Sequence, residues 1–526
     1  MKEQNIYKQT ARMLLWLVLV VVLCKVTKGY FTVAIAVAGV LCAFANQLGW
    51  ALVVFVLMPF FVAISPALVP KEGMVVAASI RFAPLLIGLI LAMHGASRTG
   101  HHRLPFFGMI PFLMFAAISS VDGWVPYVSF LKIINFIVFL FGLWFGTQNL
   151  QHRPKDVFLL RSFLLAATVF LVFGSIVLIP VPSISYATSL SSALREGGVE
   201  LANDVFMQMQ MDAEKALFCG VTCNSQALSP LLACSFIWTT CDMLFIERRF
   251  CKLHLALLGF SLPLMYMTRS RVALVTLVFG ICVVTLYVAR KIQLPQSTRR
   301  HLGNGMWVGM IGLILVTVIL QMTRGTMSEW IRKTNDVSTD KRSLGEALTG
   351  SRQGLMEYSL YEFRRRPLIG SGFQVAEYTQ EYVRGKGFVV SASVEKGILP
   401  LMVLDETGIL GSLAFLLFLV SFFFVCVQRK YFITISLFAV FLMSNMGEAT
   451  LFSPGGIGGI LWMVCVVGGF TLDTLLLYRQ NILNAWQQMG IQVAAPMWEM
   501  VEDASGRRRL VESGGRVRRY GVKERA

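Results

Sequence analysis

Charged residues are scarce in this chain. Asp, Glu, Lys and Arg make up 14% of its 526 residues, while 56% of them are hydrophobic. So few charges exclude a water-soluble domain of this length. Histidine is scarcer still, with six residues, and no Asp and His residues are spaced as ligands of a divalent metal ion. We therefore expect a membrane protein that uses neither a metal ion nor another cofactor.

Long apolar runs take the place of those charges. A run of roughly 17–25 apolar residues crosses a bilayer as one helix, and about fourteen such runs occur. They lie near residues 12–28, 31–46, 47–65, 74–95, 105–120, 124–146, 157–180, 225–245, 252–268, 271–289, 305–322, 398–427, 430–446 and 455–478. The sequence predicts an all-α integral membrane protein with about 12–14 transmembrane helices and a large extracytoplasmic loop.

The short loops carry their Lys and Arg on one side of the predicted membrane. Counting the runs puts all six basic connections together, and the positive-inside rule assigns that side to the cytoplasm. They are residues 2–12, 98–103, 153–155, 248–252, 290–300 and 429–430. Both termini then face the cytoplasm. The predicted divisions are the helices of 1–322 with an outer loop at 181–224, an extracytoplasmic loop at 323–397, the helices of 398–478, and a cytoplasmic tail at 479–526.

The net charge of +18 does not indicate a nucleic-acid partner. Residues 506–526 hold eight basic residues against two acidic ones. Such a tail is typical of a disordered segment on anionic lipid, which it binds with about 1 kcal/mol per cation. No stacking-aromatic or groove-reading motif accompanies it, so we expect membrane lipids as its partner.

The polar stretch at residues 350–411 is where chemistry in water can take place. Ser351 can cap a helix, which puts Arg352 in the first turn, where a cation opposes the helix dipole. That cost is explained if the site holds an anion, because free N–H groups and a guanidinium together bind phosphate. The alternative is an ordinary surface arginine.

Three further cations lie within the predicted spans. Arg81 and Lys132 lie about two helical turns from the outer face, where a cation either lines a cavity, finds a partner or reaches for the interface. Arg161, near the inner end of its span, is predicted to reach toward the cytoplasm. The outer turn Thr268–Arg271 adds Arg269 and Arg271, which form either a second anion clamp or a pair of solvated loop charges.

Cys219 and Cys223 lie four residues apart on the predicted outer side. Because that compartment is oxidising, a local disulfide between them is possible. The other eight cysteines fall in spans or on the inner side and are interpreted as small core residues.

Four short motifs in this order resemble the O-antigen ligase and O-antigen polymerase family. They are NSQAL from Asn224, TRSR at 268–271, GSR followed by PLIGSG at 350–372, and LDETGILG at 404–411. The resemblance covers roughly residues 219–425. It implies a bacterial inner-membrane glycosyltransferase without a metal ion, with an active site outside the cytoplasm. Its partners would be a glycan on undecaprenyl diphosphate and a glycan or lipid acceptor.

One family feature is missing. Ligases of this family have a histidine at the start of the span that leads into the ExGxxG stretch, where this chain has Gly397. All six histidines fall in a span or on the inner side, so we expect Glu395, two residues before, to replace it as acceptor base. Glu406 lies three helical turns further on the same face, and it either supports the site or pairs with a buried cation such as Arg81.

The resulting hypothesis is an O-antigen ligase-like enzyme. Arg269, Arg271 and Arg352 would bind the diphosphate with help from Arg81 and Lys132, Glu395 would be the base, and Asn224 and Glu406 would support the site. An O-antigen or exopolysaccharide polymerase of the same family remains open. A polytopic transporter is the alternative from another class, although the chain shows no internal repeat of the kind that many transporters have.

Overall fold

The structure is a computed structural model of the 526-residue chain. It describes residues 4–64, 68–69, 73–96, 108–187, 217–222, 225–247, 251–268, 270–285, 353–377, 380, 397–447, 449–488, 498–502 and 508–512. Residues Met1–Asp473 form one compact unit and residues Thr474–Ala526 a second, and each is described by itself.

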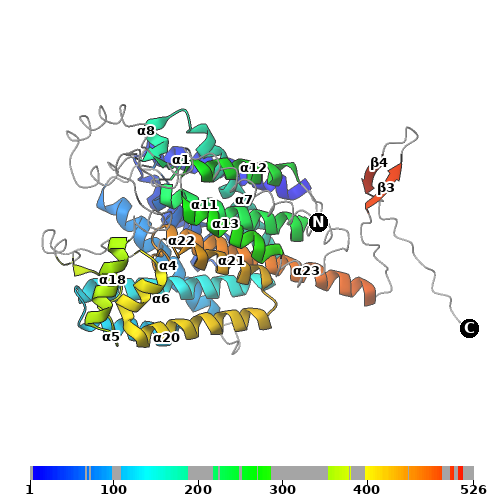
Figure 1. Cartoon of the computed structure of the whole chain (residues 1–526). Helices are drawn as coiled ribbons and strands as arrows, with labels where there is room; N and C mark the ends of the chain where they lie inside the picture. Colours follow the sequence, from blue (N-terminus) through cyan, green and yellow to red (C-terminus); the bar gives the residue numbers. More distant parts are fainter. Residues whose placement is uncertain are drawn as a thin grey trace, which may run out of the picture. The chain divides into compact units, whose positions relative to one another are not determined.

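The first half of the chain is a series of helices joined by short connections (Figure 1). They are α1 (Gln4–Val26), α2 (Phe31–Phe44), α3 (Leu48–Ala63), α4 (Met74–Ala96), α5 (Met109–Val121), α6 (Pro126–Gln148), the 3-10 turn η2 (Asn149–His152) and α7 (Pro154–Val177). Helix α4 packs against α6, α2 and α3, and α7 packs against α1 and α3. Proline occupies the first turn of both α6 and α7, where its missing N–H breaks no helical hydrogen bond.

The second half continues the helical pattern and adds a two-stranded sheet to the first unit. Its helices are α8 (Pro182–Ser185), α11 (Ser225–Cys241), the π-helix η4 (Asp242–Glu247), α12 (Lys252–Met267), α13 (Arg271–Val283), α18 (Gln353–Arg365), α20 (Leu399–Gln428), α21 (Phe432–Ser444), α22 (Ile457–Trp462), the π-helix η6 (Met463–Val467) and α23 (Gly468–Gln488). Strands β1 (Tyr186–Ala187) and β2 (Leu217–Phe218) pair antiparallel. In Figure 1, α18 runs across the end of α20, against which it packs.

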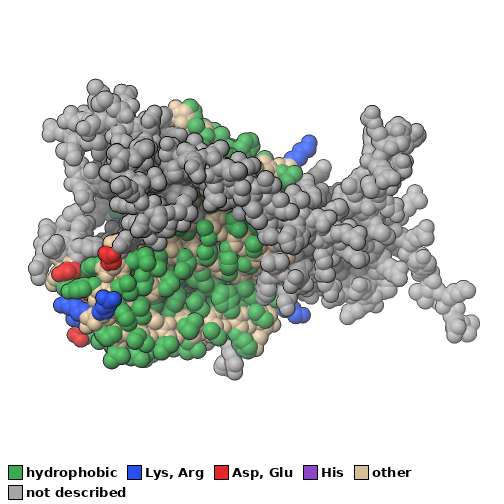
Figure 2. All heavy atoms as spheres, in the orientation of Figure 1, with side chains coloured by type: hydrophobic (Ala, Val, Ile, Leu, Met, Phe, Trp, Pro, Cys, Tyr) green, Lys and Arg blue, Asp and Glu red, His purple; other side chains and the backbone are tan. Residues whose placement is uncertain are grey.

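Many of the described helices are apolar enough for a bilayer, and some of these are also long enough to cross it. Among the described residues, seven are candidate membrane spans, and six more apolar helices are shorter. On α20 the buried face carries Ala414 and Phe418, and the exposed face carries Leu413 and Leu417. An exposed face as apolar as the core indicates hydrocarbon as its solvent (Figure 2). This confirms the predicted all-α integral membrane fold, and the predicted span at 305–322 lies outside the described residues.

Contacts between the connections follow the predicted two sides of the membrane. On the predicted outer side, Ile64 and Thr222 form a β-bridge, and Leu399 N–H donates to the Asn445 carbonyl at 3.1 Å. On the predicted inner side, Arg153 donates to the Asn46 carbonyl at 2.7 Å. Each of these contacts joins connections that the sequence places on the same side of the membrane, and the assignment of the sides stays a prediction.

An aromatic cluster fills the core beneath the outer end of α5. Phe452 lies at its centre, with ring centroids 5.2 Å from Phe112, 5.3 Å from Phe136, 5.4 Å from Phe373 and 5.7 Å from Phe415. These rings come from segments far apart in the sequence, and buried rings at such distances contribute about 0.5–1.5 kcal/mol per pair beyond the area they bury. The cluster fixes the segment around Phe373 against the membrane helices.

The second unit contains the end of α23 and a hairpin. Strands β3 (Trp498–Glu502) and β4 (Arg508–Glu512) pair antiparallel, with Trp498 opposite Glu512 and Glu502 opposite Arg508. The expectation of a disordered segment from residue 506 onward is therefore wrong for 508–512. Pairing with the preceding strand satisfies their backbone N–H and C=O groups, which composition alone does not reveal.

Candidate functional site

Helix α20 is broken at Gly408, inside the LDETGILG motif. Gly408 has φ 66° and ψ −167°, a conformation that a residue with a side chain rarely adopts. A break in a transmembrane helix frees backbone N–H and C=O groups, and each of them is costly unless another part of the protein satisfies it. The motif therefore needs a partner.

The PLIGSG turn after α18 supplies that partner. Ser371 N–H donates to the Asp405 carbonyl at 2.8 Å, and Gly372 N–H donates to the Glu406 carbonyl at 3.2 Å. In the other direction, Ile409 N–H donates to the Pro367 carbonyl at 2.9 Å, and Leu410 N–H donates to the Leu368 carbonyl at 3.3 Å. Two motifs that are more than thirty residues apart thus form one hydrogen-bonded unit, which we call the docked turn.

Glycine is required on both sides of the docked turn. A Cβ added at Gly370 would overlap the backbone of Glu406 and Thr407, and one at Gly408 would overlap the Leu368 carbonyl. Both residues also have positive φ, 76° at Gly370 and 66° at Gly408. Because the overlapping atoms are backbone, no side-chain rotation relieves the clash, and the glycines are explained by close approach as well as by conformation.

Buried carboxylates surround the docked turn. Asp405 and Glu406 of α20 are 0% and 1% exposed, and Glu362 of α18 is 2% exposed. Ser371 Oγ donates to Asp405 Oδ1 at 2.6 Å, and Ser119 Oγ donates to the Glu406 carbonyl. Among the described residues, no hydrogen-bond donor reaches Glu362 Oε1. Carboxylates held in this way can accept protons or hydrogen bonds from sugar hydroxyls.

Lys132 also reaches the docked turn. Its Nζ on α6 donates to the Gln374 carbonyl at 2.7 Å, and Gln374 Nε2 in turn donates to the Phe452 carbonyl at 2.6 Å. The structure thus brings this predicted intramembrane cation to the segment that follows PLIGSG. Its role toward a diphosphate stays a prediction.

The other predicted site residues are placed as follows. Arg271 begins α13, whose N-cap Ser270 accepts a hydrogen bond from Ala273 N–H at 3.4 Å. Arg81 is exposed on α4 while Glu406 is buried on α20, and the structure records no ion pair between them, so the alternative of an Arg81 partner for Glu406 is not supported. Cys219 is buried, and its Sγ lies 3.6 Å from the Ile184 carbonyl. The following predicted residues lie outside the described part of the chain: Asn224, Arg269, Arg352, Glu395 and Cys223.

A second buried polar cluster lies at the predicted inner end of α7, η4 and α12. Arg161 Nε donates to Asp242 Oδ1 at 2.8 Å and its NH2 to Oδ2 at 3.1 Å, while Glu247 takes a further bond from the same guanidinium. His254 Nε2 lies 2.9 Å from Asp242 Oδ2. The prediction that Arg161 reaches toward the cytoplasm is wrong, because an acid within the bundle holds its guanidinium at 4% exposure.

Sequence reasoning missed the acid and the histidine of this second cluster. The available signal was an Asp at the end of an otherwise apolar run, since an ionisable residue at membrane depth normally has a partner. In the described segments, no group of three or more His, Cys, Asp and Glu residues is arranged to hold a metal ion. Independence from a metal ion stays a prediction.

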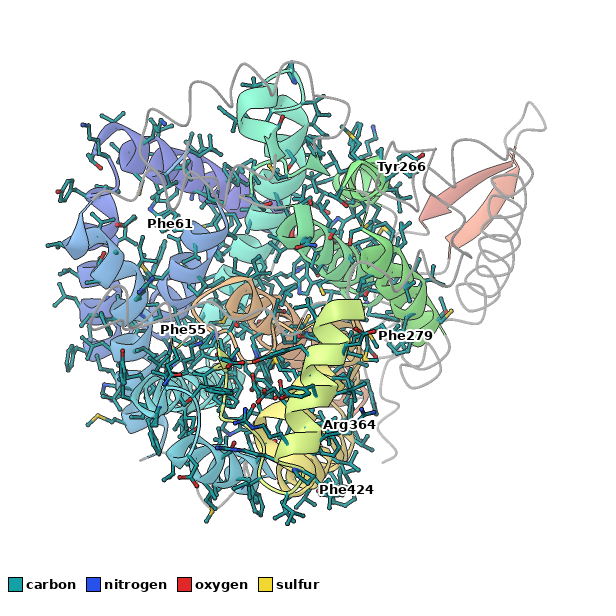
Figure 3. All side chains as sticks on the ribbon, turned by 60° about the vertical axis from the view of Figure 1, so that its left-hand side comes forward. Phe55, Phe61, Tyr266, Phe279, Arg364 and Phe424 are labelled. Atoms are coloured by element: carbon teal, nitrogen blue, oxygen red, sulfur yellow. The ribbon has the colours of Figure 1, made fainter. Side chains whose placement is uncertain are left out.

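In Figure 3, α18 lies in front of the α20 bundle, with Arg364 labelled on it. The elements that form the docked turn therefore gather at one end of the membrane helices, the end that the sequence predicts to face outward. This end combines a broken helix, buried carboxylates and a lysine, which is an arrangement suited to polar substrates at a membrane surface.

Comparison with known proteins supports the family resemblance. Residues 254–416 match the family model described as O-antigen ligase. The matched range begins at His254 and contains both motifs of the docked turn. No curated protein matches the chain. Residues 254–416 are thus similar to the O-antigen ligase family, in agreement with the resemblance that the motifs indicated.

Proposed function

We propose that this protein is a glycosyltransferase that moves a glycan from undecaprenyl diphosphate to an acceptor hydroxyl at the outer face of a bacterial inner membrane. The observation that carries the proposal is the match of residues 254–416 to the O-antigen ligase family, whose members are glycosyltransferase-like enzymes. The docked turn supports it, because two motifs of that family meet in one buried unit.

The proposed reaction is a displacement at the first sugar carbon. The acceptor oxygen forms a bond to C1 of the donor sugar, the bond from C1 to the diphosphate oxygen breaks, and the lipid diphosphate leaves with the bonding electron pair. Arg269, Arg271 and Arg352 neutralise the leaving diphosphate, and Arg81 and Lys132 add positive charge. Glu395 takes the proton of the acceptor hydroxyl.

The supporting residues have separate tasks in this proposal. Glu406 holds the docked turn through its backbone carbonyl and presents a buried carboxylate to the same end of the bundle. Asn224 precedes α11 and would contact the donor at the outer face. A disulfide between Cys219 and Cys223 would fix the segment before Asn224.

A ligase and a polymerase leave different products behind when they are lost. In a strain that lacks this protein, long glycan chains that accumulate on the lipid carrier indicate a ligase, whereas single repeat units indicate a polymerase. Normal transfer in that strain, with no accumulated lipid-linked glycan of either kind, would contradict both assignments. A transporter would instead leave the lipid-linked glycan on the inner leaflet, where a membrane-impermeant glycosidase added to intact cells does not reach it.

The anion clamp is tested by exchanging one cation for another. A guanidinium binds phosphate oxygens through two parallel hydrogen bonds, and an ammonium supplies a point charge. We therefore expect Arg352→Lys to lose most transfer activity while the protein accumulates normally. Arg429→Lys, at the C-terminal end of α20 and on the predicted inner side, is the control and should keep its activity. Equal activity of both variants would show that Arg352 is an ordinary surface arginine.

A further inference from the structure

An open hollow lies beside the docked turn. It has a volume of about 540 Å³ and is lined by Asp122, Gly123, Arg366, Pro367, Leu368 and Ile369. Its walls come from the connection between α5 and α6 and from the segment that follows α18. The size falls within the range of small-molecule sites, roughly 300–1,000 Å³.

Arginines gather at this hollow. Arg366 lines it and donates a hydrogen bond to the Asp122 carbonyl, which leaves other guanidinium N–H groups for a ligand. Arg364 and Arg365, both exposed, occupy the last turn of α18. Arg365 Cζ lies 5.3 Å from the ring centroid of Trp124, a cation–π contact that orients its guanidinium.

The acidic residues near the hollow do not cancel this charge. At the hollow itself Arg366 faces one carboxylate, that of the exposed Asp122, and Arg364 and Arg365 directly precede Arg366 in the chain. Glu357 on α18 and Glu377 beyond the docked turn are also exposed, and Glu362 on α18 is buried, but none of the three lines the hollow. The local balance is therefore positive, and the opposing group that matters most is Asp122.

The hollow also borders the surface that faces hydrocarbon. Leu368 in its wall is 61% exposed, as is Val121 at the end of α5, and Leu413 on α20 is 59% exposed. Figure 2 shows Lys and Arg side chains directly beside this hydrophobic surface, at the end where α18 lies. Cations at the edge of an apolar belt stand at the depth of lipid phosphates.

We infer that the hollow binds a membrane lipid that carries a phosphate head group. The phosphate contacts Arg366 and the arginines of the last turn of α18, and the acyl chains lie on the exposed faces of α5 and α20. Charge complementarity selects the head group, and continuity with the apolar belt selects a lipid over free phosphate. The inference goes beyond the proposed function, since it needs neither a glycan donor nor an assigned orientation in the membrane.

The test measures lipid binding to the full chain in detergent by native mass spectrometry. Dioleoyl phosphatidic acid is the phosphate-bearing probe, and dioleoylglycerol has the same tails without phosphate. We expect the first to bind more tightly, and Arg366→Gln to weaken its binding about fivefold, the effect of one cation near a lipid phosphate. Asp122→Asn should strengthen binding by a similar factor. Arg429→Gln, at the opposite end of α20, should leave binding unchanged.

Opposite effects of two neighbouring substitutions cannot arise from misfolding, which would weaken both variants. Equal binding of the two lipids would overturn the inference, as would equal losses in Arg366→Gln and Arg429→Gln. Displacement of the lipid by an equal concentration of inorganic phosphate would overturn the assignment to a lipid. Because the assay contains no glycan, its outcome is independent of whether the protein transfers one.

Discussion

Adding one methyl group at Gly370 should separate the docked turn from α20. The Cβ of Gly370→Ala would overlap the Glu406 carbonyl, and alanine would have to adopt a φ near 76°. A left-handed conformation costs a residue with a side chain about 1–2 kcal/mol. The clash cannot be relieved by a rotamer change, so the turn must move away from the helix break.

That movement breaks buried hydrogen bonds. Ser371 N–H to the Asp405 carbonyl and Gly372 N–H to the Glu406 carbonyl are the nearest ones, at 2.8 and 3.2 Å. A buried backbone group left without its partner costs about 1–3 kcal/mol. Together with the conformational cost, the docked arrangement should lose about 3 kcal/mol or more. This corresponds to at least about a hundredfold shift toward the undocked state.

The assay is glycan transfer in a deletion strain that carries each variant, with the amount of protein measured by immunoblot. Gly354→Ala is the matched control, because Gly354 lies on α18 and a Cβ there meets nothing within 4 Å. Alanine favours a helix over glycine, so the control should keep full activity. Full activity of Gly370→Ala at normal protein levels would refute the argument that the docked turn is needed.

Three further predictions concern other parts of the chain. Asp242→Asn should lower the free energy of unfolding by about 3–5 kcal/mol, because it breaks the buried ion pair with Arg161. Asp156→Asn, whose ion pair with Arg153 at 3.8 Å is partly exposed, should cost at most about 1 kcal/mol; equal melting temperatures of the two purified variants would contradict this. Glu395→Gln should slow turnover about 10²–10⁴-fold with little change in donor binding, and an unchanged rate would remove Glu395 as the base. A cysteine at Ser338 should react with a membrane-impermeant thiol reagent in intact cells and one at Ser513 should not, and the reverse labelling would invert the predicted topology.

The membrane helices were predictable because their signal is local. A run of apolar residues must become a helix in a bilayer whatever its neighbours are, since no other open structure satisfies its backbone. Residues 398–427, for example, were predicted as a span, and α20 covers Leu399–Gln428. The break within α20 was not predicted, because Gly408 is also compatible with a regular helix and its conformation depends on a turn more than thirty residues away.

The buried ion pair shows the same limit for charges. Arg161 and Asp242 are 81 residues apart, so the sequence did not indicate that they pair. The direction of the Arg161 side chain was predicted from its depth in the membrane alone, which favoured the nearer aqueous side. A partner within the bundle is a stronger determinant than distance to water, because bidentate hydrogen bonds offset much of the desolvation cost. The motifs PLIGSG and LDETGILG, in contrast, were both recognised in the sequence, but nothing in them indicated that they contact each other.

The docked turn ties the segment that follows α18 to the membrane helices. Arg366 N–H donates to the Glu362 carbonyl at 3.1 Å, which joins the end of α18 to the turn. The turn is hydrogen-bonded to α20 on both sides of Gly408. A displacement of α20 must therefore carry the turn with it or break several buried hydrogen bonds. A sugar held by residues of the segment after α18 would then keep a fixed position relative to Asp405 and Glu406, and holding reacting groups in fixed geometry is what lowers the barrier to group transfer.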